Sequence, residues 1–475
     1  MLELIFLLPM LVGLLALLLP ARVGRGVLVV TATLHLLLSV MIWFGSLPAS
    51  ASAYFHPSAP GLLVLLLTSL VFLIISVYSI SYYEREKIEK EPVFNGCMLL
   101  FLATMSMVAL ADHPIVLWIA IEATTLVSAP LIFLRRSKEA LEATWKYVLI
   151  CSVGIALALL GCFFITLSVN MAEIDVPLSF SSLNEVANRL DPLWLKVGFI
   201  FVLIGFGTKM GLAPMHTWLP DAHSQAPSPA SALLSGALLN CAFLGIYKVH
   251  TLMYLAGLGS FSSQLLIGFG LLSMLVAGIF IMKQPDYKRM LAYSSIENMG
   301  IIAFGVGIGG FALYGAVLHM VHHSLIKSSL FLSAGNILYC FGTKAVDRVG
   351  NLAGVLPRTF VPFFAGFIGI SGLPPFGIFI SELFILLGAI QGGYYAQAAL
   401  YVGCLLLVVA GAARIFTDIS FAGNGEPPLH RDSLLQVIPP NLLLLASIIL
   451  CVWMPEILHQ TIVNAISILG GTVHG

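Results

Sequence analysis

The chain has 475 residues and a formal net charge of zero at pH 7; 59% of its residues are hydrophobic and only 9% are charged. This composition excludes an ordinary soluble domain, and the neutral balance gives no sign of nucleic-acid binding. A bilayer core about 30 Å thick needs roughly 20 apolar residues per helix, and such runs recur along the whole chain. The sequence predicts an all-α polytopic membrane protein whose main partner is the lipid bilayer.

Fourteen apolar runs are long enough to be membrane spans. The first begins Met-Leu-Glu without a basic segment, and a second run follows closely, so we expect a retained helix rather than a cleaved signal peptide. The expected spans are 2–20, 27–47, 61–83, 94–111, 114–134, 143–169, 194–219, 228–254, 264–282, 289–309, 311–340, 357–391, 395–421 and 437–455.

The charges of the loops give the predicted orientation, because cytoplasmic loops carry an excess of Lys and Arg. Alternate loops, beginning with Arg22 and Arg25 and including Lys87, hold sixteen of the 22 Lys and Arg residues. The intervening loops hold only Arg189 and Lys196, and the remaining four are lysines inside expected spans. We therefore expect both termini on the outer side of the cell (inner) membrane.

Two similar segments suggest an internal repeat. GLAPMHTWL at Gly211–Leu219 and GLPPFGIFI at Gly372–Ile380 lie 161 residues and five expected spans apart. Their prolines remove backbone donors, so each segment should be a broken helix; these prolines are Pro214, Pro374 and Pro375. An odd number of intervening spans makes the copies run in opposite directions, an arrangement typical of transport sites. A coincidental pair of proline kinks is the alternative.

The repeat divides the chain into four parts. We expect three N-terminal spans in 1–93, a first five-helix repeat in 94–254, a second, inverted five-helix repeat in 264–421, and a C-terminal helix and tail in 437–475.

Four lysines and three glutamates stand inside otherwise apolar stretches. A charge at bilayer depth costs at least a few kcal/mol, so such residues usually face a protein interior or a wet cavity and serve transport. They are Lys146, Lys209, Lys248, Lys327, Glu122, Glu297 and Glu382.

The first broken segment suggests a proton switch. Lys209 stands two residues before Gly211, and Glu122 would pair with it if the fifth and seventh spans pack together. A nearby carboxylate favours a charged lysine and dehydration favours a neutral one, so opening the pair would release a proton. A static buried ion pair is the alternative.

The eleventh span contains a stripe that could pass protons. His319, His323 and Lys327 are spaced four residues apart and share one helical face. A metal site is the rival interpretation, although no carboxylate or thiolate is near in sequence. His322 lies on another face and is expected to pack between helices.

The other polar residues in the spans leave alternatives open. Glu297 is either a structural hydrogen-bonding group or part of transport, while Lys146 and Lys248 either serve transport or extend toward lipid headgroups. Seven scattered cysteines without CxxC spacing argue against zinc or iron–sulfur ligation, so we expect no cofactor in this chain. The tryptophans near span ends, Trp218 among them, are expected to be interfacial anchors.

The long motifs around these residues resemble a known family. LAPMHTWLPDAHSQAPSPASALLSGALLN, YKRMLAYSSIENMG and HSLIKSSLFLSAGNI are similar to the antiporter-like proton-conducting subunits of respiratory complex I, Mrp-type antiporters and membrane-bound group 4 hydrogenases. The resemblance covers roughly 94–421 and is strongest to the F-type subunit of hydrogenase-4 and formate hydrogenlyase-like complexes.

The resemblance implies roles for individual residues. Glu122 and Lys209 match the glutamate of the fifth helix and the lysine of the first broken helix, and His319, His323 and Lys327 match the central relay. Glu382 matches the terminal group, as in the M-type complex I subunit. Several relatives have histidine where this chain has Ser235, so Lys248 or ordered water would have to maintain continuity there.

The resemblance also implies an assembly. The chain would conduct protons without performing redox chemistry itself, in a complex with other membrane subunits and with peripheral redox subunits of the nickel–iron hydrogenase and iron–sulfur kind. An Mrp-type sodium/proton antiporter function is the alternative form of transport, and a non-conducting membrane anchor is the structural alternative.

Overall fold

The computed structural model describes residues 2–46, 52–86, 90–422, 428–431 and 433–471. Lys87 and the two chain ends, Met1 and residues 472–475, lie outside this set. The described residues form helices joined by short loops, with two isolated antiparallel bridges, Phe55 to Ala111 and Asp286 to Ala345.

The helices before the first break belong to the N-terminal part and the first repeat. They are α1 (Leu4–Ala16), α2 (Ala21–Trp43), α3 (Ala59–Glu86), α4 (Glu91–Leu110), α5 (Pro114–Ile132), η1 (Phe133–Arg135), α6 (Lys138–Met171), α7 (Phe180–Glu185), η2 (Ala187–Arg189) and α8 (Pro192–Met210).

The helices from the first break to the end of the chain include a second broken pair. They are η3 (Met215–Thr217), α9 (Trp218–Gln225), α10 (Ser228–Leu233), the π-helical turn η4 (Leu234–Leu238), α11 (Leu239–Leu255), α12 (Gly259–Ile281), α13 (Tyr287–Ile308), α14 (Gly310–Phe341), η5 (Val346–Arg348), α15 (Leu352–Val355), α16 (Pro357–Ile370), α17 (Gly377–Gln391), α18 (Tyr395–Phe421), α19 (Leu434–Val452) and α20 (Glu456–Ser467).

The fourteen expected spans all have a counterpart in the described residues. Twelve helical segments, the first break included, are long and apolar enough to cross a membrane. The other two spans are α1, which has only 13 residues, and the expected span 357–391, which is divided into α16 and α17. The helix α20 was not expected, and it packs against α3 and α14.

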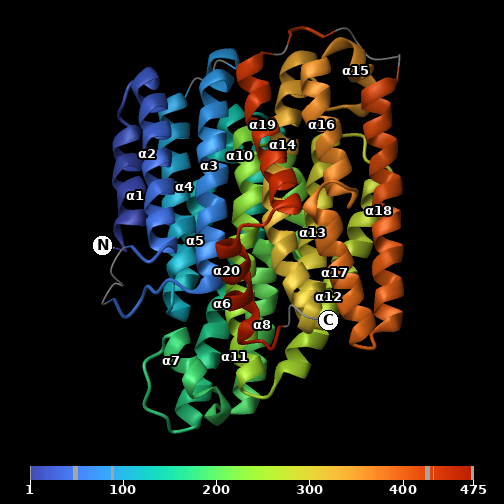
Figure 1. The fold of residues 1–475 in the computed structure, drawn as a ribbon. Coiled ribbons are helices and arrows are strands. Elements are labelled where there is room, and N and C mark those ends of the chain that lie inside the picture. Colours follow the sequence, from blue (N-terminus) through green and yellow to red (C-terminus); the bar gives the residue numbers. More distant parts are fainter. Residues whose placement is uncertain (1, 47–51, 87–89, 423–427, 432, 472–475) are drawn as a thin grey trace.

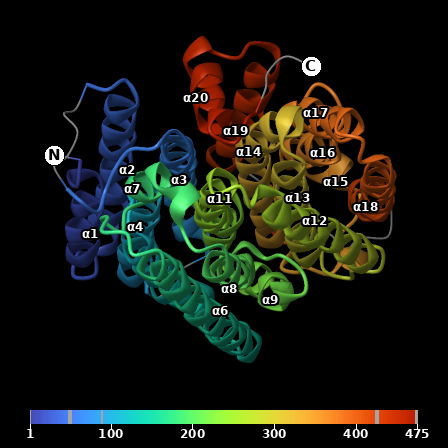
Figure 2. The ribbon, with the colours of Figure 1, turned by 90° about the horizontal axis from the view of Figure 1, so that it is seen from below.

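The helices stand side by side with their loops at two ends of a bundle (Figure 1). Seen along the bundle, α1 and α2 lie at one edge and α18 at the opposite edge (Figure 2). The long helix α6 covers one side and α20 lies on the other (Figure 2). Between these edges, α11, α13 and α14 form a core that is almost entirely buried.

The two Gly-Leu-x-Pro segments break their helices in the same way. Gly211 and Gly372 both have positive φ, 85° and 64°, which glycine adopts without a steric penalty. The amide of the following leucine then donates to the carbonyl five residues earlier, from Leu212 to Gly207 at 2.9 Å and from Leu373 to Ile368 at 3.2 Å. This is the hydrogen-bond pattern of a helix C-terminus. Both segments also contain a cis X-Pro bond.

The broken segments run in opposite directions through the bundle. The first follows α7 at the lower end in Figure 1, and the second follows α15 at the upper end. Their packing also corresponds, since α6 packs on α8 and α14 packs on α16 and α17. The fold is therefore the expected one of two inverted repeats, each with a broken helix.

Candidate functional site: a buried row of ionisable residues

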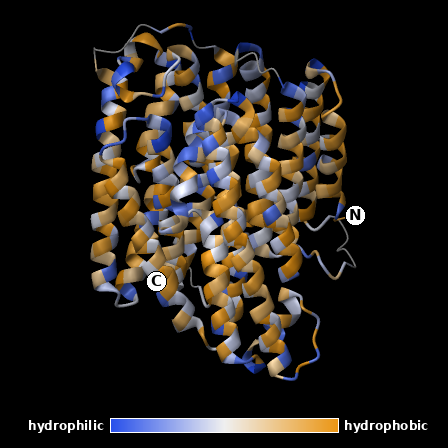
Figure 3. Ribbon diagram, turned by 180° about the vertical axis from the view of Figure 1, so that it is seen from behind, coloured by the Kyte–Doolittle hydropathy of each residue, from blue (hydrophilic) through white to orange (hydrophobic). Residues whose placement is uncertain are grey.

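Hydrophilic residues lie inside the bundle, between helices whose other residues are mostly apolar (Figure 3). They form a row that begins at the first break and ends at the second. Its members are buried lysines, histidines and hydroxyl or amide side chains, with a glutamate near each end.

Lys209 is fully buried at the C-terminal turn of α8. Its Nζ donates to Thr125 Oγ1 of α5 at 2.8 Å and to Tyr147 Oη of α6 at 2.6 Å. The same Nζ lies 4.5 Å from the centre of the Tyr147 ring. Tyr147 Oη also shares a hydrogen bond with Ser128 Oγ, at 2.6 Å. A ring of neutral oxygens and one aromatic face therefore surrounds this amine.

Glu122 does not form the expected direct ion pair with Lys209. Its Oε1 accepts a hydrogen bond from Ser152 Oγ of α6 at 2.9 Å, and its Oε2 is buried without a partner among the described residues. Glu122 bonds α6 at Ser152, while Lys209 reaches α5 at Thr125 instead. Glu122 stands one turn of α5 from Thr125, the residue that accepts from Lys209.

The π-helical turn η4 brings the two repeats into contact. Ser235 Oγ shares a hydrogen bond with Ser295 Oγ of α13 at 2.9 Å. Asn240 Nδ2 donates to Ser324 Oγ of α14 at 2.7 Å. π-Helical turns are often found at functional sites. Ser235 therefore lies where the two repeats meet.

Lys327 is fully buried on α14. Its Nζ donates to the carbonyl of Leu291 at 2.6 Å and to Ser294 Oγ, both on α13. Glu297 stands one turn further along α13 and is 3% exposed. The closest polar contact that the structure gives its carboxylate is Asn298 Nδ2, 3.4 Å from Oε2. The second lysine, like the first, is thus held by neutral oxygens.

Near the second break, the hydrogen bonds run from α14 to α13 and α17 and not along the predicted face of α14. His319 Nε2 shares a hydrogen bond with Asn298 Oδ1 at 2.9 Å, and its Nδ1 shares one with Ser381 Oγ of α17 at 3.0 Å. His323 is fully buried, and neither ring nitrogen has a partner among the described residues. His322 instead bonds Ser447 of α19, at 3.0 Å from Nδ1.

Glu382 follows Ser381 on α17 and its carboxylate lies against the second break. A Cβ added to Gly372 would overlap this carboxylate. No hydrogen bond or ion pair joins Glu382 to another described residue. Gly372 therefore has two roles: it adopts the positive φ of the break, and its missing Cβ leaves room for the Glu382 carboxylate.

Two of the expected intramembrane lysines lie away from the row. Lys248 is 7% exposed, donates to the carbonyl of Ala111 and lies 5.3 Å from the centre of the Phe180 ring, so it does not extend toward headgroups. It lines a cavity of about 440 Å³ that Asp112 also lines. The side chain of Lys146 is 44% exposed and pairs with Glu142 at 2.5 Å.

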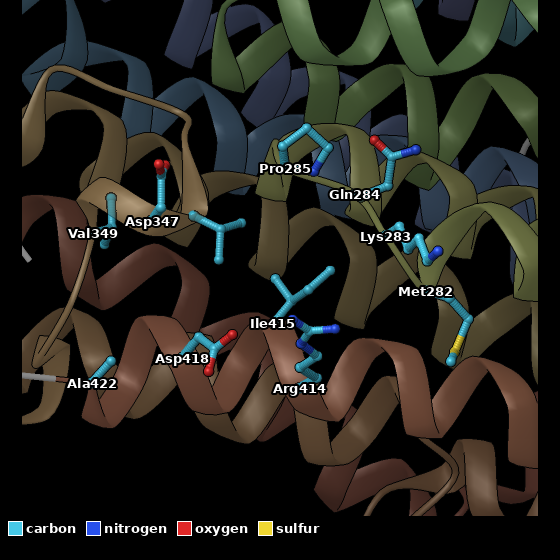
Figure 4. A pocket seen from close by; sticks show the side chains of 11 residues that line it. Met282, Lys283, Gln284, Pro285, Asp347, Val349, Arg414, Ile415, Asp418 and Ala422 are labelled. Atoms are coloured by element: carbon cyan, nitrogen blue, oxygen red, sulfur yellow. The ribbon is translucent and has the colours of Figure 1, made fainter. Parts of the chain in front are cut away.

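Another cavity also lies apart from the row. It has a volume of about 670 Å³ and opens between the loop that follows α12, the η5 segment and α18 (Figure 4). Lys283, Asp347, Arg414 and Asp418 line it. Within the described part of the chain, no three or more His, Cys, Asp or Glu side chains gather where a metal ion could bind.

Several polar residues of the row were missed by the sequence analysis, among them Thr125, Tyr147, Ser294, Asn298 and Ser381. Tyr147 follows Lys146, and Asn298 follows Glu297. The sequence feature that could have identified them is a hydrogen-bonding group near an ionisable residue in an apolar run. This feature is weak evidence, because serine and threonine hydroxyls can also bond within their own helix.

Comparisons with known proteins agree with this architecture. The chain is 38% identical over 338 residues to the hydrogenase-4 component F homolog of Methylacidiphilum infernorum, covering 70% of each protein. It is 28% identical over 453 residues to hydrogenase-4 component B of Escherichia coli, covering 86% of this chain and 66% of that one. A chain in the structure of the Mrp complex from Dietzia sp. DQ12-45-1b has a TM-score of 0.87 at 19% identity, covering 98% of this chain and 97% of that one.

The family model for the transmembrane region of NADH:quinone oxidoreductase and Mrp antiporters matches residues 111–407. That range contains the whole row, from Glu122 to Glu382. The chain belongs to the NADH:quinone oxidoreductase/Mrp antiporter transmembrane family.

Proposed function

We propose that this chain is a proton-translocating membrane subunit of a redox-driven assembly of the hydrogenase-4 kind. The observation that carries the proposal is the row itself, which holds the buried Lys209 in the first repeat, and the buried Lys327 and the partly buried Glu382 in the second. Burying charged groups without paired counter-charges is costly, so such residues are usually retained for transport.

The hydrogen bonds suggest how protons would move. Lys209 gives up a proton through the hydroxyls of Thr125 and Tyr147, and the hydroxyl contact between Ser235 and Ser295 brings the repeats together. A neutral hydroxyl passes a proton only when it accepts one and donates another, so water must complete the row between these groups. The orphaned nitrogens of His323 are a place where such water would bind.

The second half of the row would deliver the proton to Glu382. Lys327 receives it near Ser294. His319, which Asn298 and Ser381 hold in place, would take the proton from water and release it toward Glu382, since an imidazole can bind a proton on one nitrogen and release it from the other. Glu382 then accepts it at the second break. Lys248, which lies outside the row, would serve as a side branch from the 440 Å³ cavity.

The driving force would come from partner subunits. This chain would hold no redox cofactor, and electron transfer in nickel–iron hydrogenase-like and iron–sulfur subunits would change the field at Glu122. At an effective dielectric near 20, a unit charge about 4 Å away is worth about 4 kcal/mol, enough to change the charge state of Lys209. We place the assembly in the cell (inner) membrane with both termini of this chain outside, on the basis of the loop charges.

Sodium exchange is the second candidate function. It is favoured by the similarity to the Mrp complex and by 31% identity over 436 residues to one of the sodium/proton antiporter proteins of Alkalihalophilus pseudofirmus, covering 85% of this chain and 52% of that one. In that case Glu122 and Glu382 would exchange sodium for protons. A complex I protein of the M type would instead use the same row with NADH-oxidising partners.

One preparation tests these candidates. The tagged chain is purified in mild detergent, its partners are identified by mass spectrometry, and the complex is placed in vesicles containing a pH-sensitive dye and driven with reduced methyl viologen. Nickel–iron and iron–sulfur subunits, with proton movement unchanged by removal of sodium, are the expected result. Membrane subunits without a redox protein, or proton movement that requires sodium, would contradict the proposal.

A further inference from the structure

The carboxylate of Asp221, on α9, is shared by helices from both repeats. Oδ2 accepts a hydrogen bond from Lys146 Nζ of α6 at 3.1 Å, and Oδ1 forms an ion pair with the guanidinium of Arg289 on α13. Its side chain is only 19% exposed. Asp221 thus fastens α9, the second half of the first broken helix, to one helix of each repeat.

One turn earlier on α9, Trp218 forms part of the Lys209 pocket. It is fully buried, so the expected interfacial position was wrong. Its Nε1 donates to the carbonyl of Thr208 at 2.8 Å, and its ring lies 4.9 Å from the ring of Tyr147. Thr208 precedes Lys209 in the chain, and Tyr147 accepts a hydrogen bond from the Lys209 amine. The position of α9 therefore determines two walls of the Lys209 pocket.

The ion pair between Asp221 and Arg289 lies close in the chain to the residues that bind Lys327. Arg289 stands in the first turn of α13, directly before the residues whose oxygens accept from Lys327, the carbonyl of Leu291 and Ser294 Oγ. A displacement of this end of α13 would therefore move both acceptors. The carboxylate of Asp221 is a charged contact between α9 and α13, beside the hydrogen bond from Ser224 Oγ of α9 to Asp286 Oδ2, the cap of α13, at 2.7 Å.

Other charged groups lie near Asp221 and could form alternative ion pairs with its partners. Asp221, Lys146 and Arg289 line a cavity of about 260 Å³, together with Glu139, Glu142, Gln225 and Asp286. Lys344 lies 3.8 Å from Asp286, and burial lowers the pKa of its ammonium while Asp286 raises it. Partly exposed ion pairs contribute little stability each, so alternative pairings among the groups that line this cavity are close in free energy.

We propose that Asp221 is a positioning residue that couples the Lys209 pocket to the Lys327 pocket. Its two ion pairs hold Trp218 against Tyr147 and, at the same time, hold the start of α13 in register. The proposal rests on the proton row described above, and it assigns to Asp221 a role in aligning the two lysines rather than in carrying the proton.

The test compares variants of the purified complex in dye-loaded vesicles driven by reduced methyl viologen. Asp221→Asn should slow proton movement about fivefold, the size expected when one or two partly exposed pairs are lost, with its subunits still assembled. Asp221→Glu should recover at least half of the rate. Asp347→Asn, at an exposed carboxylate of the same end, is the matched control and should be unchanged.

A double-mutant cycle distinguishes coupling from simple loss of stability. Arg289→Gln should be as slow as Asp221→Asn, and the double variant should be no slower than either, because all three break the same bridge. Additive losses, or a rate for Asp221→Asn within twofold of the unaltered complex, would overturn the proposal. If Asp221→Asn fails to assemble, Arg289→Gln and Lys146→Gln carry the same test with the carboxylate kept.

Lys209→Ala separates this inference from the proposed function. If Lys209→Ala abolishes proton movement and Asp221→Asn does not affect it, only the role of Asp221 is wrong. If Lys209→Ala itself has no effect, the proton row is wrong.

Discussion

His319 and Asn298 share a hydrogen bond of 2.9 Å between Nε2 and Oδ1, and this contact joins α14 to α13 in the buried core. The other nitrogen of His319 reaches Ser381, the residue before Glu382. Asn298 also donates from Nδ2 to the carbonyl of Ser294 at 2.6 Å, beside the hydroxyl that accepts from Lys327. A single amide therefore lies between the second lysine and the histidine that leads to the terminal acid.

Asn298→Ala should interrupt this connection. Loss of a buried hydrogen bond costs about 1–3 kcal/mol when its partner is left unsatisfied, so we expect proton movement to be at least about tenfold slower in the dye-loaded vesicles. Asn441→Ala is the matched control, because Asn441 bonds only within its own helix α19. Equal rates for the two variants would show that protons do not pass through this contact.

Glu382→Gln should stop proton movement while leaving the complex assembled. The amide is almost isosteric with the acid and fits beside Gly372, but it cannot bind and release a proton in the working pH range. The measurements are the pH change in vesicles and the subunit composition after purification. Unchanged pumping with impaired assembly would favour the non-conducting anchor instead.

Gly372→Ala should damage the second break. Its φ of 64° is strained for alanine, and the added Cβ would overlap the Glu382 carboxylate. We expect a loss of more than about 1 kcal/mol of stability, seen as a lower unfolding temperature of the purified complex, together with slower proton movement. Gly403→Ala on α18, where a Cβ meets open space, should alter neither property, and similar effects of both substitutions would argue against this role of the break.

Much of the fold could be predicted because the membrane imposes simple rules. Apolar length gave the spans, and the Gly-Leu-x-Pro spacing gave both breaks and their opposite directions, since an odd number of spans reverses a helix. The amphipathic helix α20 was missed because its 12 residues are too short and too polar to be a membrane span.

The candidate site was only partly predictable, because lateral packing decides which side chains meet. Glu122 and Lys209 were expected to pair directly, but Lys209 reaches Thr125 on α5 while Glu122 bonds Ser152 of α6, and no periodicity along one helix contains that information. His319 and His323 share a face of α14, yet only His319 reaches the polar groups of α13 and α17. Trp218 stands near a span end in sequence but lies in the interior because the broken segment folds inward.

The central claim is that both repeats conduct through their buried lysines, and Lys209→Ala and Lys327→Ala test it most directly. Each variant is purified with its partner subunits, driven with reduced methyl viologen in dye-loaded vesicles, and compared with Lys138→Ala, a control at an exposed lysine. The account predicts that each core substitution reduces proton movement at least about hundredfold, equivalent to about 2.7 kcal/mol, while the control is unchanged. Proton movement that persists at the control rate in either core variant would contradict it.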